Sequence, residues 1–112
     1  MRRAKREFVR VCAVSDVPEE GAISVVVDDL PIAVVRSQGR LYAIQDVCSH
    51  ENVALSEGEV EEGTIECWLH GSRFNLGSGR AIGPPATRSV PVYPVRAEDG
   101  DVYVEVHRRV RT

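Results

Sequence analysis

Cys48-Ser49-His50 and Cys67-Trp68-Leu69-His70 are two short stretches that each place a thiol one or two residues before an imidazole. Sixteen residues separate His50 from Cys67. Thiolate sulfur and imidazole nitrogen are donors that proteins use to bind zinc and iron–sulfur centres. The two pairs therefore predict a metal centre held by Cys48, His50, Cys67 and His70, and no other part of the chain offers a comparable cluster.

The donor set admits more than one kind of centre. Four Cys and His ligands suit a structural zinc site that ties two loops together. They also suit a two-iron cluster in which Cys48 and Cys67 hold one iron and His50 and His70 hold the other. Replacing two thiolates by imidazoles removes negative charge from such a cluster and raises its potential. A third interpretation is that the cysteines are unliganded core residues and the histidines are surface residues. It requires the two Cys–His pairs to have arisen by chance. Cys12 differs, because it lies in an apolar run without a neighbouring His, and we expect it to pack as a small hydrophobic residue.

The spacing C-x-H-x16-C-x2-H resembles that of bacterial Rieske-type [2Fe-2S] ferredoxins, and the resemblance covers nearly the whole chain. It continues outside the ligands in residues 55–58, 65–67, 70–74, 77–79 and 90–95. The resemblance implies an all-β Rieske fold of small antiparallel sheets and one Rieske-type [2Fe-2S] cluster. It also implies the ferredoxin component of a non-haem iron ring-hydroxylating dioxygenase system.

Such a ferredoxin is a one-electron carrier and not an enzyme. The resemblance implies two partners, a flavin-containing ferredoxin reductase and a terminal oxygenase or similar acceptor. A terminal Rieske oxygenase needs a further 2-His-1-carboxylate iron site, and only His107 remains outside the quartet. Some actinobacterial relatives with a similar Cys-Trp-Leu-His-Gly-Ser stretch accompany iron–sulfur assembly genes. An accessory ferredoxin of cluster assembly and a zinc-stapled interaction module therefore stay open as alternatives.

The 112 residues predict a single domain, residues 1–112. Residues rich in β-branched and aromatic side chains predict strands at 8–14, 23–27, 32–37 and 41–45, with further strands at 90–96 and 102–107. Gly39 predicts a hairpin turn between the strands at 32–37 and 41–45, and Gly100 predicts one between the strands at 90–96 and 102–107. Residues from about 46 to 82 contain all four ligand candidates and predict a cluster-binding subdomain. Residues of about 7–45 and 83–107 form the base.

Charge and hydropathy indicate where such a protein works. The formal net charge is −3, and residues 16–62 hold eleven acids against two arginines, so nucleic-acid binding is not expected. No run of eighteen apolar residues and no signal-peptide core is present. We therefore expect a soluble cytoplasmic monomer that does not bind a membrane.

The resemblance also bears on the reduction potential. High-potential relatives brace the two ligand loops with a disulfide, and Val53 and Leu69 stand at those positions here. This implies a potential near the bottom of the Rieske range. Phe74 replaces a Tyr of high-potential relatives, whereas Ser72 either donates a hydrogen bond to cluster sulfur or is a simple turn residue. Trp68 and Leu69 either restrict water around the irons or belong to the core of their loop.

Overall fold

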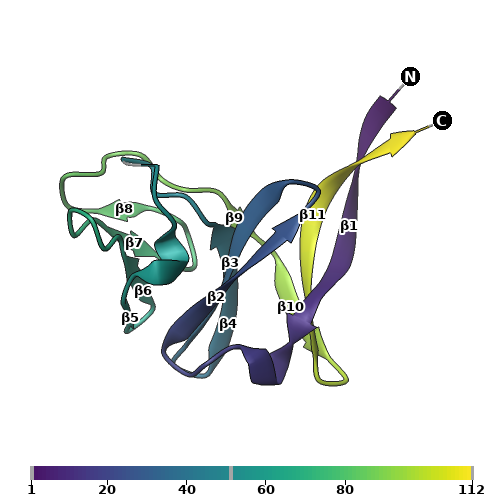
Figure 1. Ribbon diagram of the computed structural model, residues 1–112, viewed down its shortest axis with the longest axis horizontal. Helices are drawn as coiled ribbons and strands as arrows, with labels where there is room; N and C mark the ends of the chain where they lie inside the picture. The colour runs from purple at the N-terminus through teal and green to yellow at the C-terminus, as the bar shows by residue number, and fades with distance from the viewer. Residues whose placement is uncertain (1, 51, 112) are drawn as a thin grey trace.

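The computed structural model describes the backbone of residues 2–50 and 52–111 and the side chains of residues 6–50 and 52–107. Its strands form three antiparallel sheets, which confirms the predicted all-β fold (Figure 1). In the part of the chain that is described, no helix has the length and apolar character needed to span a membrane.

The first sheet has the strand order β1-β11-β10 and joins the two ends of the chain. Its strands are β1 (Arg2–Ala13), β10 (Val95–Glu98) and β11 (Asp101–Arg111). Both long strands extend past the predicted bounds, because they pair with each other from Arg2↔Arg111 to Ala13↔Asp101. Each strand supplies the backbone hydrogen-bond partners of the other, so they lengthen together. The short 3-10 helix η1 (Val14–Asp16) follows β1.

The second sheet is central and has the order β2-β3-β4-β9. Its strands are β2 (Gly21–Val27), β3 (Leu30–Ser37), β4 (Arg40–Gln45) and β9 (Val92–Tyr93). Two-residue turns connect the first three strands, and all four turn residues have positive φ: Asp28, Asp29, Gln38 and Gly39. Positive φ at both positions matches the twist of the flanking strands and makes a tight hairpin.

The third sheet has the order β5-β6-β7-β8 and lies at the opposite end of the molecule from the first (Figure 1). Its strands are β5 (Val60–Glu61), β6 (Thr64–Glu66), β7 (Arg73–Asn75) and β8 (Ala81–Ile82). The 3-10 helix η2 (Leu55–Glu57) precedes it. These elements fall within the predicted subdomain of about 46–82, whose boundaries stay a prediction.

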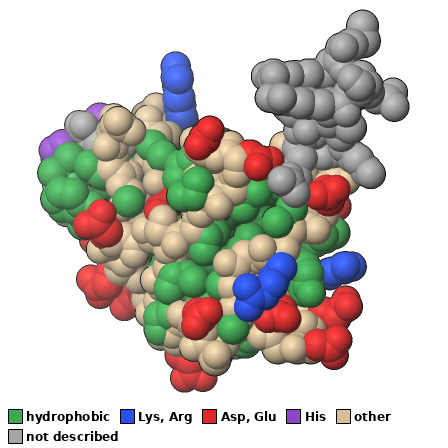
Figure 2. Space-filling model, turned by 45° about the vertical axis from the view of Figure 1, so that its right-hand side comes forward, with side chains coloured by type: hydrophobic (Ala, Val, Ile, Leu, Met, Phe, Trp, Pro, Cys, Tyr) green, Lys and Arg blue, Asp and Glu red, His purple; other side chains and the backbone are tan. Residues whose placement is uncertain are grey.

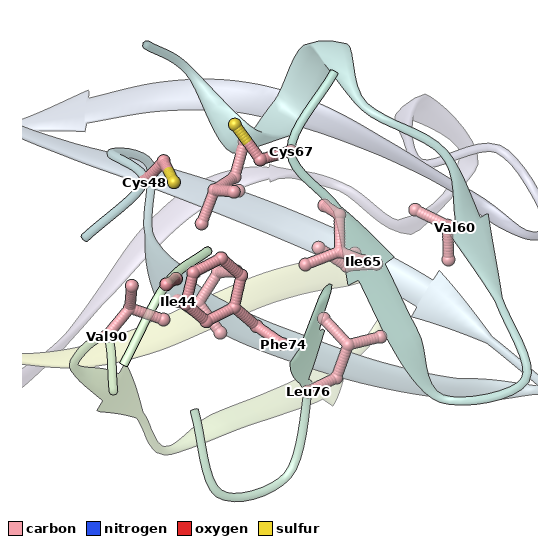
Figure 3. Packing of buried hydrophobic residues seen from close by; sticks show 12 residues of the cluster. Ile44, Cys48, Val60, Ile65, Cys67, Phe74, Leu76 and Val90 are labelled. Carbon is pink, nitrogen blue, oxygen red and sulfur yellow. The ribbon is translucent and has the colours of Figure 1, made fainter. Parts of the chain in front are cut away.

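Strand β3 separates two hydrophobic cores, because consecutive side chains of a strand point to opposite faces. Ile32 and Val34 face the first core, which we call the base core, and Ala33 and Val35 face the second, the site core. The base core consists of Cys12, Val17, Val27, Ile32, Val34, Ala43, Val102, Val104 and Val106. The site core consists of Ala33, Val35, Ile44, Cys48, Leu55, Val60, Ile65, Cys67, Phe74, Leu76, Ala86 and Val90 (Figure 3). Both faces of β3 are therefore covered, which explains its unbroken apolar run.

A polar junction ties the central sheet to the third sheet. Ser37 is fully buried at the end of β3, and its hydroxyl donates to Glu20 Oε2 at 2.9 Å. The Gly63 N–H donates to Ser37 Oγ at 2.8 Å, and the Gln38 N–H donates to Glu20 Oε1. The turn between β5 and β6 is thus fixed to the turn between β3 and β4.

Glu20 makes this junction sensitive to acid. The Gln38 N–H, and after it the Ser37 hydroxyl, hold the pKa of Glu20 below its ordinary value of 4.5. A carboxylate with a lowered folded pKa stabilises the fold above its unfolded pKa, and this contribution is lost as the pH falls through the folded pKa. We expect the stability advantage of the wild type over Glu20→Gln to be constant above about pH 6 and to shrink below pH 4.5. Urea unfolding at stepped pH measures it, and parallel curves for both proteins would contradict the expectation.

Candidate metal centre

The first ligand loop follows β4 and carries Cys48 and His50. Cys48 is 3% exposed and packs into the site core. Its N–H donates to the Val53 carbonyl at 2.9 Å, and the His50 N–H lies 3.4 Å from Cys48 Sγ. The loop therefore turns the thiol inward while the His50 side chain is exposed.

The second ligand loop connects β6 to β7 and carries Cys67 and His70. The Cys67 N–H donates to the Ser72 carbonyl at 2.6 Å, and the Gly71 N–H donates back to the Cys67 carbonyl at 3.0 Å. Cys67 is 1% exposed, whereas His70 is exposed. Antiparallel pairing of β6 with β7 holds both ends of this loop.

The fold brings the four predicted ligands together as two pairs. Cys48 and Cys67 lie at one end of the site core (Figure 3). The rings of His50 and His70 lie 5.6 Å apart between centroids with an interplanar angle of 71°. Histidine side chains are visible at one edge of the molecule, beside hydrophobic ones (Figure 2). The thiols are thus inside and the imidazoles outside.

The electrostatics of the thiol pair follow from this burial. Removal from water raises the pKa of the Cys67 thiol, and the neighbouring Cys48 raises it further. The N–H groups of Leu69 and His70 act in the opposite direction, because they donate toward the sulfur. Donors directed at Cys67 favour an anionic sulfur, which is the form that binds iron.

A third loop contacts both ligand loops. The Ser49 hydroxyl donates to the Arg88 carbonyl at 2.6 Å, and the Ala86 N–H donates to Ser72 Oγ at 3.1 Å. The segment after Pro84 and Pro85 therefore lies beside the centre. Ser72 is 1% exposed, and its hydroxyl oxygen accepts the hydrogen bond from Ala86.

Trp68 and Leu69 do not belong to the core of their loop, so that interpretation is wrong. Trp68 is 52% exposed and Leu69 is 39% exposed. The tight turn that directs Cys67 inward and His70 outward leaves the two intervening side chains on the surface. Ile82 of β8 is a further exposed hydrophobic residue, at 48%.

The contact between Asp46 and Ser56, near the centre, has no counterpart in the sequence analysis. Asp46 is buried two residues before Cys48, and it contacts Ser56 at the start of η2. A buried acid beside a ligand is a recognisable signal, but its partner ten residues later cannot be found from local sequence pattern.

The arrangement fits a two-iron cluster with mixed ligands. Such a cluster takes two sulfurs on one iron and two nitrogens on the other, so its donors are needed in pairs. Among the side chains of residues 6–50 and 52–107, no three from His, Cys, Asp or Glu are grouped so that they could hold a single metal ion. The paired thiols and paired imidazoles match the chemistry of the mixed-ligand cluster.

Comparison with known proteins bears on the identity of this centre. The Rieske [2Fe-2S] domain model matches residues 7–94. The 3-phenylpropionate/cinnamic acid dioxygenase ferredoxin subunit of Escherichia coli (strain K12) is 42% identical over 100 residues, which cover 88% of this chain and 92% of that protein. The structure of a Sphingomonas yanoikuyae B1 ferredoxin superposes with a TM-score of 0.83 at 29% identity, covering 89% of this chain and 99% of that one.

A further solved structure contains a ferredoxin together with an oxygenase. In the complex of reduced oxygenase and oxidized ferredoxin in carbazole 1,9a-dioxygenase, the matching chain has a TM-score of 0.79 and 36% identity. The match covers 87% of this chain and 91% of that one. The predicted resemblance is thereby confirmed. The chain belongs to the Rieske [2Fe-2S] domain family, and its cofactor is one Rieske-type [2Fe-2S] cluster.

Proposed function

We propose that Cys48 and Cys67 bind one iron of the cluster and that His50 and His70 bind the other. The observation that carries this assignment is the pairing of two buried thiols with two exposed imidazoles 5.6 Å apart. Sulfur ligands on one iron and nitrogen ligands on the other are what a Rieske centre requires.

The protein acts as a one-electron carrier, the ferredoxin of a ring-hydroxylating dioxygenase system. The E. coli relative is a dioxygenase ferredoxin subunit, and the match covers 92% of its length. A ferredoxin of the same fold is found in complex with the oxygenase of carbazole 1,9a-dioxygenase. We assign a flavin-containing reductase as electron donor and a terminal oxygenase as acceptor.

The side chains around the centre suit this role. When bound, the cluster accepts and releases a single electron. The site core excludes water from Cys48 and Cys67, whereas His50 and His70 reach the surface where a partner docks. Exposed Trp68 gives that surface an aromatic contact, and aromatic residues are enriched where proteins bind each other.

The alternatives receive less support. The E. coli relative is a dioxygenase ferredoxin subunit, and the carbazole 1,9a-dioxygenase structure is a complex of a ferredoxin with an oxygenase; neither is described as an assembly factor or a zinc module. A monomeric state and a cytoplasmic location stay predictions. None of the three described cysteines forms a disulfide, which is compatible with a reducing compartment.

Electron paramagnetic resonance of the dithionite-reduced protein tests the assignment. We expect a signal whose average g value lies clearly below that of an all-cysteine cluster, and a visible spectrum that bleaches on reduction. A colourless and silent protein that contains stoichiometric zinc after anaerobic preparation would contradict both the cluster and the electron-transfer function.

Ser72 provides a prediction on the potential of the centre. Its buried hydroxyl accepts from the Ala86 N–H, and we expect it to donate its own proton to a sulfur of the bound centre. Such a bond favours the reduced, more negative state, so Ser72→Ala should lower the reduction potential. If the hydrogen bond stabilises the reduced state over the oxidised state by about 1.4 kcal/mol, its loss lowers the one-electron reduction potential by roughly 60 mV. Redox titration followed by circular dichroism measures it, and an unchanged potential would identify Ser72 as a turn residue only.

A further inference from the structure

The two ligand loops are closed in different ways. The second loop lies between β6 and β7, and backbone pairing closes it through the Cys67 N–H and the Ser72 carbonyl. The first loop leaves β4 at Gln45, which pairs with Ile32 of β3, and it ends in the single turn of η2, so its two ends are not paired with each other as strands. Its shape therefore depends on side chains to a degree that the second loop does not.

Asp46 supplies the closure of the first loop. Its carboxylate is buried at 3% exposure, and its Oδ1 accepts the Ser56 N–H at 2.6 Å. Its Oδ2 accepts the Ser56 hydroxyl at 2.6 Å. Hydrogen bonds to an ionised carboxylate are shorter and stronger than neutral ones. One side chain thus joins the first residue of the loop to the helix at its end.

Both ends of this bridge are fixed to the rest of the protein. The Asp46 N–H donates to the Pro31 carbonyl of β3 at 2.9 Å. Leu55, next to Ser56, is fully buried in the site core. Neither end can shift without breaking a hydrogen bond or opening the core, so the Asp46–Ser56 bridge sets the width of the loop.

The two candidate ligands lie inside the bridge. Cys48 lies two residues beyond Asp46. Its N–H donates to the Val53 carbonyl at 2.9 Å, and this bond closes a smaller ring inside the ring that Asp46 and Ser56 close. The His50 N–H in turn contacts the Cys48 sulfur at 3.4 Å. A displacement of Asp46 would therefore displace the backbone that carries the side chains of Cys48 and His50.

We propose that Asp46 is a positioning residue of the metal centre: through its two hydrogen bonds from Ser56, its buried carboxylate determines where Cys48 and His50 present their donor atoms. This rests on the proposed ligand assignment. Groups that orient metal ligands without touching the metal typically change metal affinity by about 10–100-fold when removed. Because backbone pairing closes the second loop, Asp46 acts on the Cys48–His50 half of the centre.

The test compares four variants of the cluster-loaded protein. Ser56→Ala removes the hydroxyl bond and keeps the N–H bond, and Asp46→Asn removes the charge and one acceptor oxygen, so both variants weaken the bridge. Ser56→Thr keeps both the hydroxyl and the N–H. Ser37→Ala is the matched control, because it removes another buried hydroxyl that bonds a carboxylate and a backbone N–H, away from both ligand loops. The measurements are the rate of bleaching in excess EDTA, the g values of the dithionite-reduced protein, and the melting temperature.

We expect Ser56→Ala and Asp46→Asn to release the cluster about 10-fold faster or more, with shifted or broadened g values. Ser56→Thr should behave as the wild type. Ser37→Ala should melt at a lower temperature and yet keep the wild-type release rate and g values. If Asp46→Asn does not fold, Ser56→Ala decides, since it leaves the carboxylate in place.

The outcomes separate this role from the proposed function. A wild-type protein without a Rieske signal overturns both. A wild-type protein with the signal, together with bridge variants that match it in release rate and g values, overturns only the positioning role. Equal acceleration by Ser37→Ala also overturns it, because general loss of stability would then explain the effect.

Discussion

Cys67→Ala should yield a folded protein that contains almost no iron and gives no Rieske signal after reduction. Cys67 is 1% exposed and lies with Cys48 at one end of the site core, so no other side chain among the described residues can replace its sulfur. With one sulfur left, the iron that the two cysteines share lacks half of its protein ligands. Iron analysis and electron paramagnetic resonance on the same preparation measure the effect.

Cys12→Ala is the matched control for this loss. Cys12 is also buried, at 6% exposure, but it packs in the base core on the other side of β3. We expect Cys12→Ala to keep its iron and its signal. Its free energy of unfolding should be about 1 kcal/mol lower than that of the wild type, because a small cavity replaces the sulfur. Retention of the cluster by Cys67→Ala, or its loss from Cys12→Ala, would contradict the ligand assignment.

Gly58→Ala should strongly destabilise the protein. Gly58 follows η2, and its N–H donates to the Leu55 carbonyl at 2.9 Å. A Cβ at this position would lie 1.6 Å from the Glu66 carbonyl oxygen, a distance that no rotamer change relieves because both groups are backbone. Strand β6 would have to move, and with it the start of the second ligand loop.

We expect a loss of about 3 kcal/mol or more, since the collision exceeds ordinary overpacking. Thermal unfolding should show a melting temperature lower by roughly 10–20 °C. Gly77→Ala is the control, because a Cβ there meets only the Asn75 side chain at 3.4 Å. Similar melting temperatures for the two variants would show that the backbone at Gly58 is free to adjust.

The ligand candidates could be predicted because their chemistry is local. One thiol and one imidazole within three or four residues, repeated once, already restrict the centre to a few kinds. The predicted hairpins at Gly39 and Gly100 are confirmed, since the residues before each glycine also have positive φ. The hairpin at Asp28 and Asp29 was not predicted, because its turn has no glycine, although aspartate tolerates positive φ.

Other features depend on partners that are distant in sequence. The lengths of β1 and β11 follow from pairing across residues as far apart as Arg2 and Arg111. The unbroken apolar run of β3 is explained only by the tertiary structure, in which each face of the strand packs against a different core.

The sequence by itself determined which side chains can bind metal and that the chain is built from short strands, because donor type and alternation are properties of neighbouring residues. Only the tertiary structure decided that the thiols are inside and the imidazoles outside, that Trp68 is exposed, and that Asp46 closes the first loop through Ser56. Burial and hydrogen bonding join residues from different loops, so they are set by how the sheets pack and not by local pattern.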